Sequence, residues 1–327
     1  MASEAEANEA EGAGESSGLH QPHDKLFTAA FGVPENAAGF LRAQLPSRLA
    51  NAIDWESLCP QPGSFVDSTF RRSHTDLLFS ASIDGRETLL YLLFEHQSAC
   101  DPRLPLRLLR YLVRIWEDCA RKLPDRTKLP PILPVVLSQN AEVWEVPDSL
   151  GAMLDLPPDL AGDLTPFLPD FTYRHLQLAE TDYASLPGTR AGIFVLRTMK
   201  AERRGELLGE VVWEEDLILG IPRELYQMVL RYILAAEIDR DAFENRLNQL
   251  RDPELRTDAM TLAQVYRQEG RQKSRQEDIL DALELRFGQV SEEIREMIRS
   301  QGGEARLREL FRAAIQCASL EKFRGAL

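Results

Sequence analysis

The dipeptide Asp84-Gly85 constrains the fold more than any other feature of this sequence, because it separates two strand-like runs. Residues 75–83 read TDLLFSASI and residues 88–94 read TLLYLLF. Asp-Gly readily adopts the positive φ angles that a tight turn between antiparallel strands requires. We therefore predict a β-hairpin whose second strand, almost continuously apolar, lies centrally in a sheet.

The length of the turn determines which residues of this hairpin face each other. A two-residue loop places Asp76 opposite Leu93 and diagonal to Glu95, whereas a four-residue loop places Asp76 directly opposite Glu95. Both registers put Asp76, Glu95 and Gln97 on one face, because side chains alternate along a strand. A three-residue loop would separate them.

Two carboxylates at this separation repel each other, and their partial burial is costly unless a cation neutralises them. Mg²⁺ prefers one or two carboxylates together with water and phosphate oxygens. The alternative is that Asp76 merely begins one strand and Glu95 merely ends the other. The polar cluster Glu95-His96-Gln97-Ser98 directly follows the apolar run, at the strand end where functional sites are commonly built.

The remaining pattern predicts an α/β protein with a mixed central sheet flanked by helices. Asp24 is expected to cap a first helix, although it could instead support the metal site. Trp55 and Leu58 are expected in a loop or a third helical turn. Further elements are expected as helices at about 36–44 and 103–122 and as strands at 64–70 and 130–138.

The C-terminal half is predicted to be α-helical. Residues 146–169 are expected to be irregular, and residues 186–250 show helical periodicity. Residues 264–279 are polar nearly all round, and an apolar helical face returns after them. The expected organisation is an acidic tail at 1–20, a core at 21–180, a helical extension at 181–260, and a charged connector with a C-terminal helical module at 261–327.

Charge is distributed unevenly along the chain. The net charge of −14 argues against indiscriminate nucleic-acid binding, but the predicted disordered tail alone contributes five glutamates. Residues 103–128 hold eight basic residues against three acidic ones. One stripe of this helix is therefore predicted to contact DNA phosphates, through Arg103, Arg107, Arg110 and Arg114. The alternative is that these arginines form an ordinary solvated helix face.

The cysteine pattern and the hydropathy pattern favour a cytoplasmic protein without a membrane segment. The four cysteines are widely separated and form no CxxC pair, which argues against a zinc site or a thioredoxin-like motif. No apolar run approaches the roughly 20 residues that span a bilayer. The first residues also lack the pattern of a signal peptide.

Several short motifs together resemble the Rpn family of recombination-promoting nucleases, YhgA-like proteins of the PD-(D/E)XK superfamily. They include His23-Asp24-x-x-Phe27, Asp76-Leu77-Leu78-Phe79, Glu95-His96-Gln97-Ser98 and Arg107-Leu108-Leu109-x-Tyr111. The resemblance covers roughly residues 22–240. Leu285-Arg286-Phe287-Gly288 also resembles a C-terminal module often attached to such proteins.

This resemblance implies a DNA endonuclease, linked to recombination or mobile elements, that uses Mg²⁺ or another divalent cation such as Mn²⁺ or Ca²⁺. Asp76, Glu95 and the carbonyl of His96 would bind the metal, and Gln97 occupies the superfamily's lysine position. Gln177 stands where family members tend to have an acid. A catalytically weak or inactive DNA- or protein-binding module is therefore the alternative. Homo-oligomerisation through the C-terminal helices is also expected.

Overall fold

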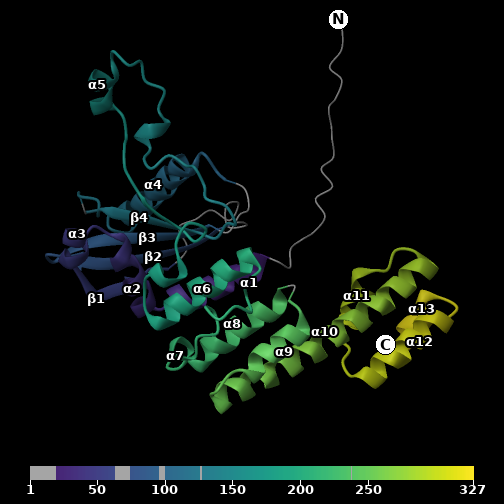
Figure 1. The fold of residues 1–327 in the computed structure, drawn as a ribbon. Coiled ribbons are helices and arrows are strands. Elements are labelled where there is room, and N and C mark those ends of the chain that lie inside the picture. The colour runs from purple at the N-terminus through teal and green to yellow at the C-terminus, as the bar shows by residue number, and fades with distance from the viewer. Residues whose placement is uncertain (1–19, 63–73, 96–99, 126, 237) are drawn as a thin grey trace, which may run out of the picture. The chain divides into compact units, whose positions relative to one another are not determined.

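The computed structural model describes residues 20–62, 74–95, 100–125, 127–236 and 238–327. The chain forms two compact units, residues 1–242 and 243–327. A five-stranded sheet lies at the centre of the first unit, and its spatial order is the chain order, β1-β2-β3-β4-β5 (Figure 1). Two of its strand pairings are antiparallel and two are parallel, so the predicted mixed sheet is confirmed.

The predicted hairpin is formed by β2 (His74–Ile83) and β3 (Arg86–Glu95). Asp84 and Gly85 make a two-residue turn with φ angles of 49° and 72°, both in the left-handed region. The ladder pairs Ile83 with Arg86 and Asp76 with Leu93 throughout an uninterrupted register. The two-residue alternative is therefore confirmed, and the four-residue register is wrong.

Strand β1 (Ile53–Pro60) pairs with β2 at the edge of the sheet. The expectation of a loop or helical turn around Trp55 was therefore wrong. Within β1 only Ile53 and Leu58 are buried, so the strand lacks the regular apolar alternation that reveals a half-buried strand in a sequence. Pairing with β2 decides its conformation, which is a tertiary effect. The strand predicted at 64–70 lies outside the described residues.

Strands β4 (Ile132–Ser138) and β5 (Arg174–Gln177) complete the sheet in parallel. The strand predicted at 130–138 is thereby confirmed. Leu93 pairs with Val136, and Val136 pairs with His175. One end of the sheet thus collects the carboxyl ends of β3, β4 and β5.

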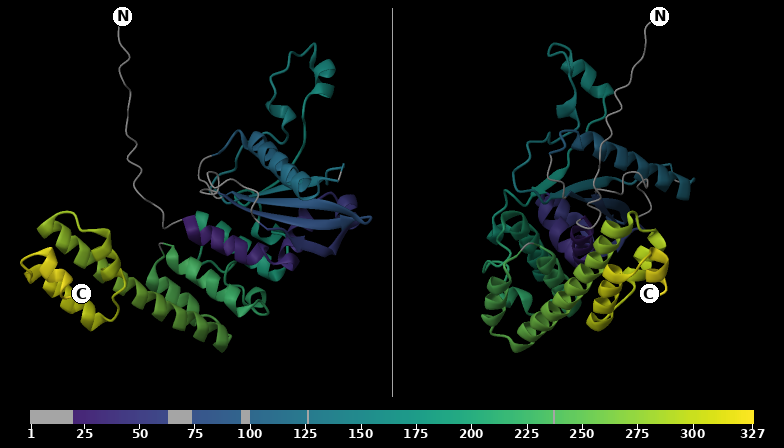
Figure 2. Two further views of the ribbon diagram at one scale, coloured as in Figure 1. Left: turned by 180° about the vertical axis from the view of Figure 1, so that it is seen from behind. Right: turned by 90° about the vertical axis from the view of Figure 1, so that its right-hand side faces the viewer.

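Helices cover both faces of the sheet, as the two orientations in Figure 2 show. Helix α4 (Leu104–Lys122), which confirms the helix predicted at 103–122, lies on one side. Its inner residues share a core with the strand residues of that face: Leu78, Leu89, Tyr91, Leu93, Leu104, Leu108, Tyr111, Ile115, Val136 and Tyr173. Helices α1 (His20–Phe31), α6 (Arg190–Arg204) and α8 (Arg223–Ala235) lie on the other side.

Helix α1 begins earlier than the sequence predicted. It starts at His20, so Asp24 is an interior helical residue and the prediction that it caps the helix was wrong. The helix is held by its apolar face, where Leu26, Phe27 and Phe31 are fully buried. Helix α2 (Pro34–Gln44) follows and confirms the second predicted helix.

The chain between β4 and β5 is largely irregular, as predicted for residues 146–169. It contains three short helical turns: η1 (Gly151–Met153), α5 (Ala161–Leu164) and η2 (Thr165–Phe167). The remaining helices of the first unit are short: α3 (Ser47–Ala52), η3 (Tyr183–Ser185) and α7 (Glu215–Ile218). Helix α9 (Arg240–Asn248) spans the boundary between the two units.

The second unit is helical and has its own core. The 35-residue helix α10 (Pro253–Phe287) begins with Asp252, whose side chain accepts hydrogen bonds from the N–H groups of Glu254 and Leu255. Leu283 and other apolar residues of its later turns pack with the helices that follow. These are α11 (Glu292–Arg299), α12 (Glu304–Gln316) and α13 (Leu320–Arg324).

The predicted fold class is confirmed: an α/β sheet flanked by helices, followed by a helical C-terminal region. Among the residues described, no helix combines the length and apolar character needed to span a membrane.

Candidate metal and nucleic-acid site

The hairpin brings positions 76 and 95 to the same face of the sheet, near one end. Asp76 pairs with Leu93, and Glu95 pairs with His74, so Asp76 and Glu95 occupy diagonal positions. Diagonal neighbours in an antiparallel pair lie about 7–8 Å apart. The Asp76 side chain is half-buried. His96, Gln97 and the side chain of Glu95 lie outside the described part of the structure.

The same end of the sheet carries further polar residues: Gln177, which the resemblance singled out, and Ser138 and His175, which the sequence did not indicate. Glu95 pairs with Ser138 on β4, and Ser138 pairs with Gln177 on β5. In the neighbouring row, His175 lies on the same face as Asp76. The His175 Nε2 atom is 2.9 Å from the Ser138 hydroxyl oxygen. The row that begins with Glu95 therefore continues in polar residues to the edge strand.

Gln177 is engaged at both ends of its amide. Its Oε1 accepts a hydrogen bond from the Trp144 N–H at 2.6 Å, and its Nε2 donates to the Trp144 carbonyl at 3.1 Å. Trp144 is buried, so these backbone groups need partners inside the protein. A carboxylate could accept from the N–H but could not donate to the carbonyl. The amide at position 177 therefore has a structural role.

Helix α4 begins close in sequence to the end of β3, after residues 96–103. Asp101 forms a turn before the helix: its carboxylate accepts from the Arg103 N–H at 2.9 Å, and its carbonyl accepts from the Leu104 N–H at 3.1 Å. The same carboxylate forms an ion pair with Arg107 at 2.9 Å. Of the four arginines expected to contact DNA, Arg103 and Arg110 are exposed, whereas Arg107 and Arg114 are half-buried.

A buried hydrogen-bond network supports the end of β4 on the opposite face of the sheet. Gln139, fully buried, donates from Nε2 to the Tyr232 hydroxyl at 2.9 Å and to a Glu202 carboxylate oxygen at 3.2 Å. The Tyr232 hydroxyl also lies 2.8 Å from Nδ1 of His23. Burial raises the pKa of Glu202, and it also raises the pKa of Tyr232. The network ties α1, α6 and α8 to the strand that carries Ser138.

The donor chemistry at the hairpin fits a hard divalent cation. Carboxylate oxygens are the protein ligands that Mg²⁺ and Ca²⁺ prefer, and the two acidic positions share one face. The described residues contain no cluster of three or more metal-binding side chains. His96, Gln97 and the Glu95 side chain lie outside the described residues. The fit to a divalent cation therefore rests on the positions of residues 76 and 95.

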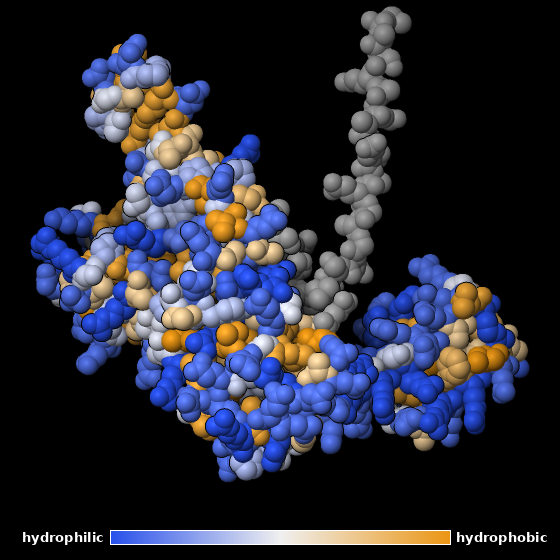
Figure 3. All heavy atoms as spheres, viewed as in Figure 1, coloured by the Kyte–Doolittle hydropathy of each residue, from blue (hydrophilic) through white to orange (hydrophobic). Residues whose placement is uncertain are grey.

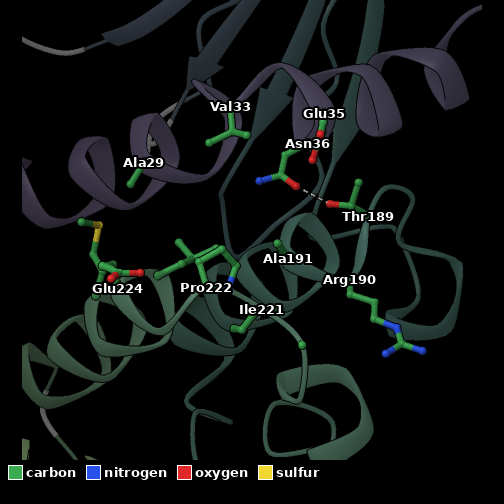
Figure 4. Close-up of a pocket in the computed structure, with 13 residues that line it drawn as sticks. Ala29, Val33, Glu35, Asn36, Thr189, Arg190, Ala191, Ile221, Pro222 and Glu224 are labelled. Atoms are coloured by element: carbon green, nitrogen blue, oxygen red, sulfur yellow. Dashed lines mark hydrogen bonds between the residues drawn. The ribbon is translucent and has the colours of Figure 1, made fainter. Parts of the chain in front are cut away.

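A separate pocket of 450 Å³ lies in the helical layer on the other side of the sheet from Asp76 (Figure 4). Its walls come from α1, α2, α6 and α8. At one end, the Thr189 hydroxyl donates to the Asn36 side-chain oxygen at 2.5 Å. Because the sheet stands between this pocket and the hairpin carboxylates, we assign it no part in metal chemistry.

Comparison with known proteins identifies the family. The sequence model described as "Putative transposase, YhgA-like" matches residues 21–214, more than half of the chain. The chain belongs to this family. The YhgA-like match covers the whole sheet, α4 and α6, and therefore positions 76, 95 and 177 and the arginines of α4.

The curated relatives of this YhgA-like chain include Rpn proteins of Escherichia coli. The inactive recombination-promoting nuclease-like protein RpnE of strain K12 is 27% identical over 78% of this chain and 85% of its own length. The recombination-promoting nuclease RpnC of strain K12 is 32% identical over 36% of this chain and 39% of its own length. RpnD of strain O157:H7, also named a recombination-promoting nuclease, is 32% identical over 38% of this chain and 49% of its own.

The Rpn family prediction is confirmed by these matches. The matches to RpnC and RpnD span less than half of those proteins, and the long match is to a relative named inactive. No solved structure matches this chain.

Proposed function

We propose that this chain is a DNA endonuclease that depends on a divalent cation, with Asp76 and Glu95 as the protein ligands of that cation. The observation that carries the proposal is the diagonal placement of positions 76 and 95, which the Asp84-Gly85 turn enforces. The names of RpnC and RpnD as recombination-promoting nucleases support the same activity and its link to recombination.

Mg²⁺ is the expected cation, and Mn²⁺ or Ca²⁺ could occupy the same oxygen ligands. When bound, such a cation would polarise the scissile phosphate and acidify a water for attack. Asp76 and Glu95 would hold the cation, and the His96 carbonyl is proposed as a third ligand. Gln97 is proposed to orient the phosphate or the water by hydrogen bonding, because an amide can do so without carrying charge.

DNA binding is proposed on the side of the sheet covered by α4. Arg103 and Arg110 are exposed there, and each can neutralise one backbone phosphate. The N-terminal end of α4 follows the end of β3, and the helix dipole there also favours an anion. Because the chain as a whole is acidic, it would repel DNA everywhere except at this arginine stripe of α4.

The second candidate is a nuclease-fold module that binds DNA or protein without cleaving. It is favoured by Gln177, which is engaged with Trp144 instead of offering an acid, and by the long match to a relative named inactive. Under this alternative Asp76 and Glu95 could still bind a cation.

Nicking of supercoiled plasmid, with Mg²⁺ or with a chelator, tests the proposal. We expect nicking that requires Mg²⁺ and that falls about 100-fold or more in Asp76→Ala. Glu87→Gln is the matched control, because Glu87 is an exposed acid on the same strand as Glu95 but at its far end. Equal nicking by wild type and Asp76→Ala would refute the proposed site.

Cation binding is measured separately, by calorimetry with Mn²⁺ in the absence of DNA. Binding that is lost in Asp76→Ala, together with no cleavage under any divalent cation, would favour the non-catalytic module. Cleavage without cation binding at these residues would contradict both candidates.

A further inference from the structure

Residues 151–170, which we name the arm, form an excursion between β4 and β5 that stands away from the sheet (Figures 1 and 2). All of its residues are described, and none is buried. Yet it carries the kind of side chains that normally fill a core. They are Met153, Leu154, Leu156, Leu160, Leu164, Phe167 and Leu168.

Two of these side chains are largely exposed, and the other five are half-buried. Phe167 is 84% exposed and Leu160 is 52% exposed. In Figure 3 the hydrophobic residues gather along the arm as a continuous group. Exposed apolar groups of this kind, rimmed by polar residues, mark interaction sites on soluble proteins.

Hydrogen bonds close the stem of the arm. The Leu150 N–H donates to the Phe171 carbonyl at 3.1 Å, and the Gly151 N–H donates to the Asp170 carboxylate at 2.6 Å. The Tyr173 hydroxyl donates to the Pro147 carbonyl at 2.5 Å. Burial, reinforced by nearby negative charge, raises the pKa of Tyr173 to about 12, so this donor stays protonated. A preformed segment loses less entropy when it binds.

The charge of the arm restricts its partner. Residues 141–172 contain seven acidic residues and no basic one, and four of the acids, all aspartates, belong to the arm. Such a segment is repelled by nucleic-acid phosphates. The partner surface that complements the arm is apolar and bordered by basic side chains.

The outer face of α4 offers that chemistry on the same molecule. Leu106 is 45% exposed and Val113 is 40% exposed, and their spacing puts both on one side of the helix. The exposed Arg103 and Arg110 alternate with them along that side, at the spacings of adjacent helical turns. This outer face is thus an apolar strip bordered by positive charge.

We propose that the arm of one copy of this chain docks on the outer face of α4 in a second copy, and reciprocally. The arm and α4 are neighbours in one protomer, because Phe171 and Tyr173 at the stem pack in the core that includes Tyr111 and Ile115. A two-fold axis would therefore form two equal contacts at once. A stable interface needs about 800 Å² from each partner, which two arms can supply together more readily than one.

The test is the mass of the full chain in solution, measured by light scattering over a range of concentrations at low salt and without DNA. Wild type is expected to approach twice the mass of one chain. The double substitution Leu160→Ser with Phe167→Ser is expected to weaken the dimer at least about tenfold. Leu219→Ser is the control, because Leu219 is 40% exposed and follows α7, outside the arm, α4 and the C-terminal helices.

Charge reversal gives a sharper result. Variant A carries Asp159→Arg with Asp163→Arg on the arm, and variant B carries Arg103→Glu with Arg110→Glu on α4. Each variant alone is expected to remain monomeric. Their mixture is expected to dimerise, because the A arm then faces the B helix with opposite charge, while the B arm and the A helix are unchanged.

Two outcomes would overturn the proposal. One is a wild-type chain that stays monomeric at every concentration. The other is a dimer that the arm variants and the α4 variants leave intact. Neither outcome depends on cleavage, so the nuclease proposal is tested independently. Docking of the arm would compete with DNA for Arg103 and Arg110, and the mass is therefore measured without DNA.

Discussion

Gln177 at the end of β5 holds both backbone polar groups of Trp144, one through its side-chain oxygen and one through its side-chain nitrogen. This contact fixes the chain that leaves β4 against the edge of the sheet. It also explains in physical terms why an amide, and not a carboxylate, suits position 177 in this chain.

We expect Gln177→Glu to lower the free energy of unfolding by about 1–3 kcal/mol, because the Trp144 carbonyl loses its donor and faces a negative charge. Urea unfolding at neutral pH measures this loss. Gln227→Glu, the same change at a half-exposed position of α8, should have little effect. An unchanged unfolding midpoint in Gln177→Glu would contradict the structural role.

The left-handed turn predicts a specific effect of Gly85→Ala. No atom lies within 4 Å of a Cβ added at Gly85, so the cost comes from its φ of +72° alone. We expect a loss of about 1–2 kcal/mol in stability. Gly162→Ala is the control, because a Cβ there also meets open space but φ is not positive. Equal stability of the two variants in urea unfolding would argue against the turn.

Glu202 should make stability depend on pH in a direction that its burial determines. Burial, opposed in part by Arg203, holds the pKa of Glu202 above its ordinary value of 4.5. Above pH 4.5 the folded chain therefore binds a proton more readily than the unfolded chain, and stability falls as pH rises through the folded pKa.

Glu202→Gln removes this ionisation. It should be more stable than wild type at pH 8, and the difference should shrink as the pH approaches 4.5. Thermal unfolding at several pH values measures the difference. Glu210→Gln, at an exposed acid, should show no such trend. A difference that does not change with pH would disprove the explanation.

Arg110→Ala should weaken DNA binding in a manner that depends on salt. If Arg110 neutralises one phosphate, the slope of log affinity against log salt concentration should decrease by about one. Fluorescence anisotropy with a labelled duplex at several salt concentrations measures this slope. Arg42→Ala, on α2 in the opposite helical layer, is the control. The same slope for all three proteins would exclude Arg110 from the DNA contact.

The hairpin was predictable down to its register because the turn lies next to the residues that it pairs. Asp84-Gly85 determines the pairing of Asp76 with Leu93 by counting outward. The parallel pairing of β3, β4 and β5 has no such turn to set its register, since long connections join these strands. The row from Glu95 through Ser138 to Gln177 therefore could not be read from the sequence.

Other features were missed for local reasons. Strand β1 has only two buried residues, and its pairing with β2 decides its conformation. Asp24 has the chemistry of a helix cap, but the helix continues to His20, and no apolar periodicity marks those first residues. The partner of Gln177 lies in an irregular segment, where a sequence pattern predicts no contact.

The agreement between spatial and chain order in the sheet has a consequence for synthesis. Each strand joins the edge left by the preceding one, so the sheet can assemble as the polypeptide emerges from the ribosome. The contact between α1 and α8 cannot form so early, because His23 meets Tyr232 only after more than two hundred further residues have been translated. We expect nascent chains to leave the side of α1 that receives α8 uncovered until α8 has left the ribosomal tunnel.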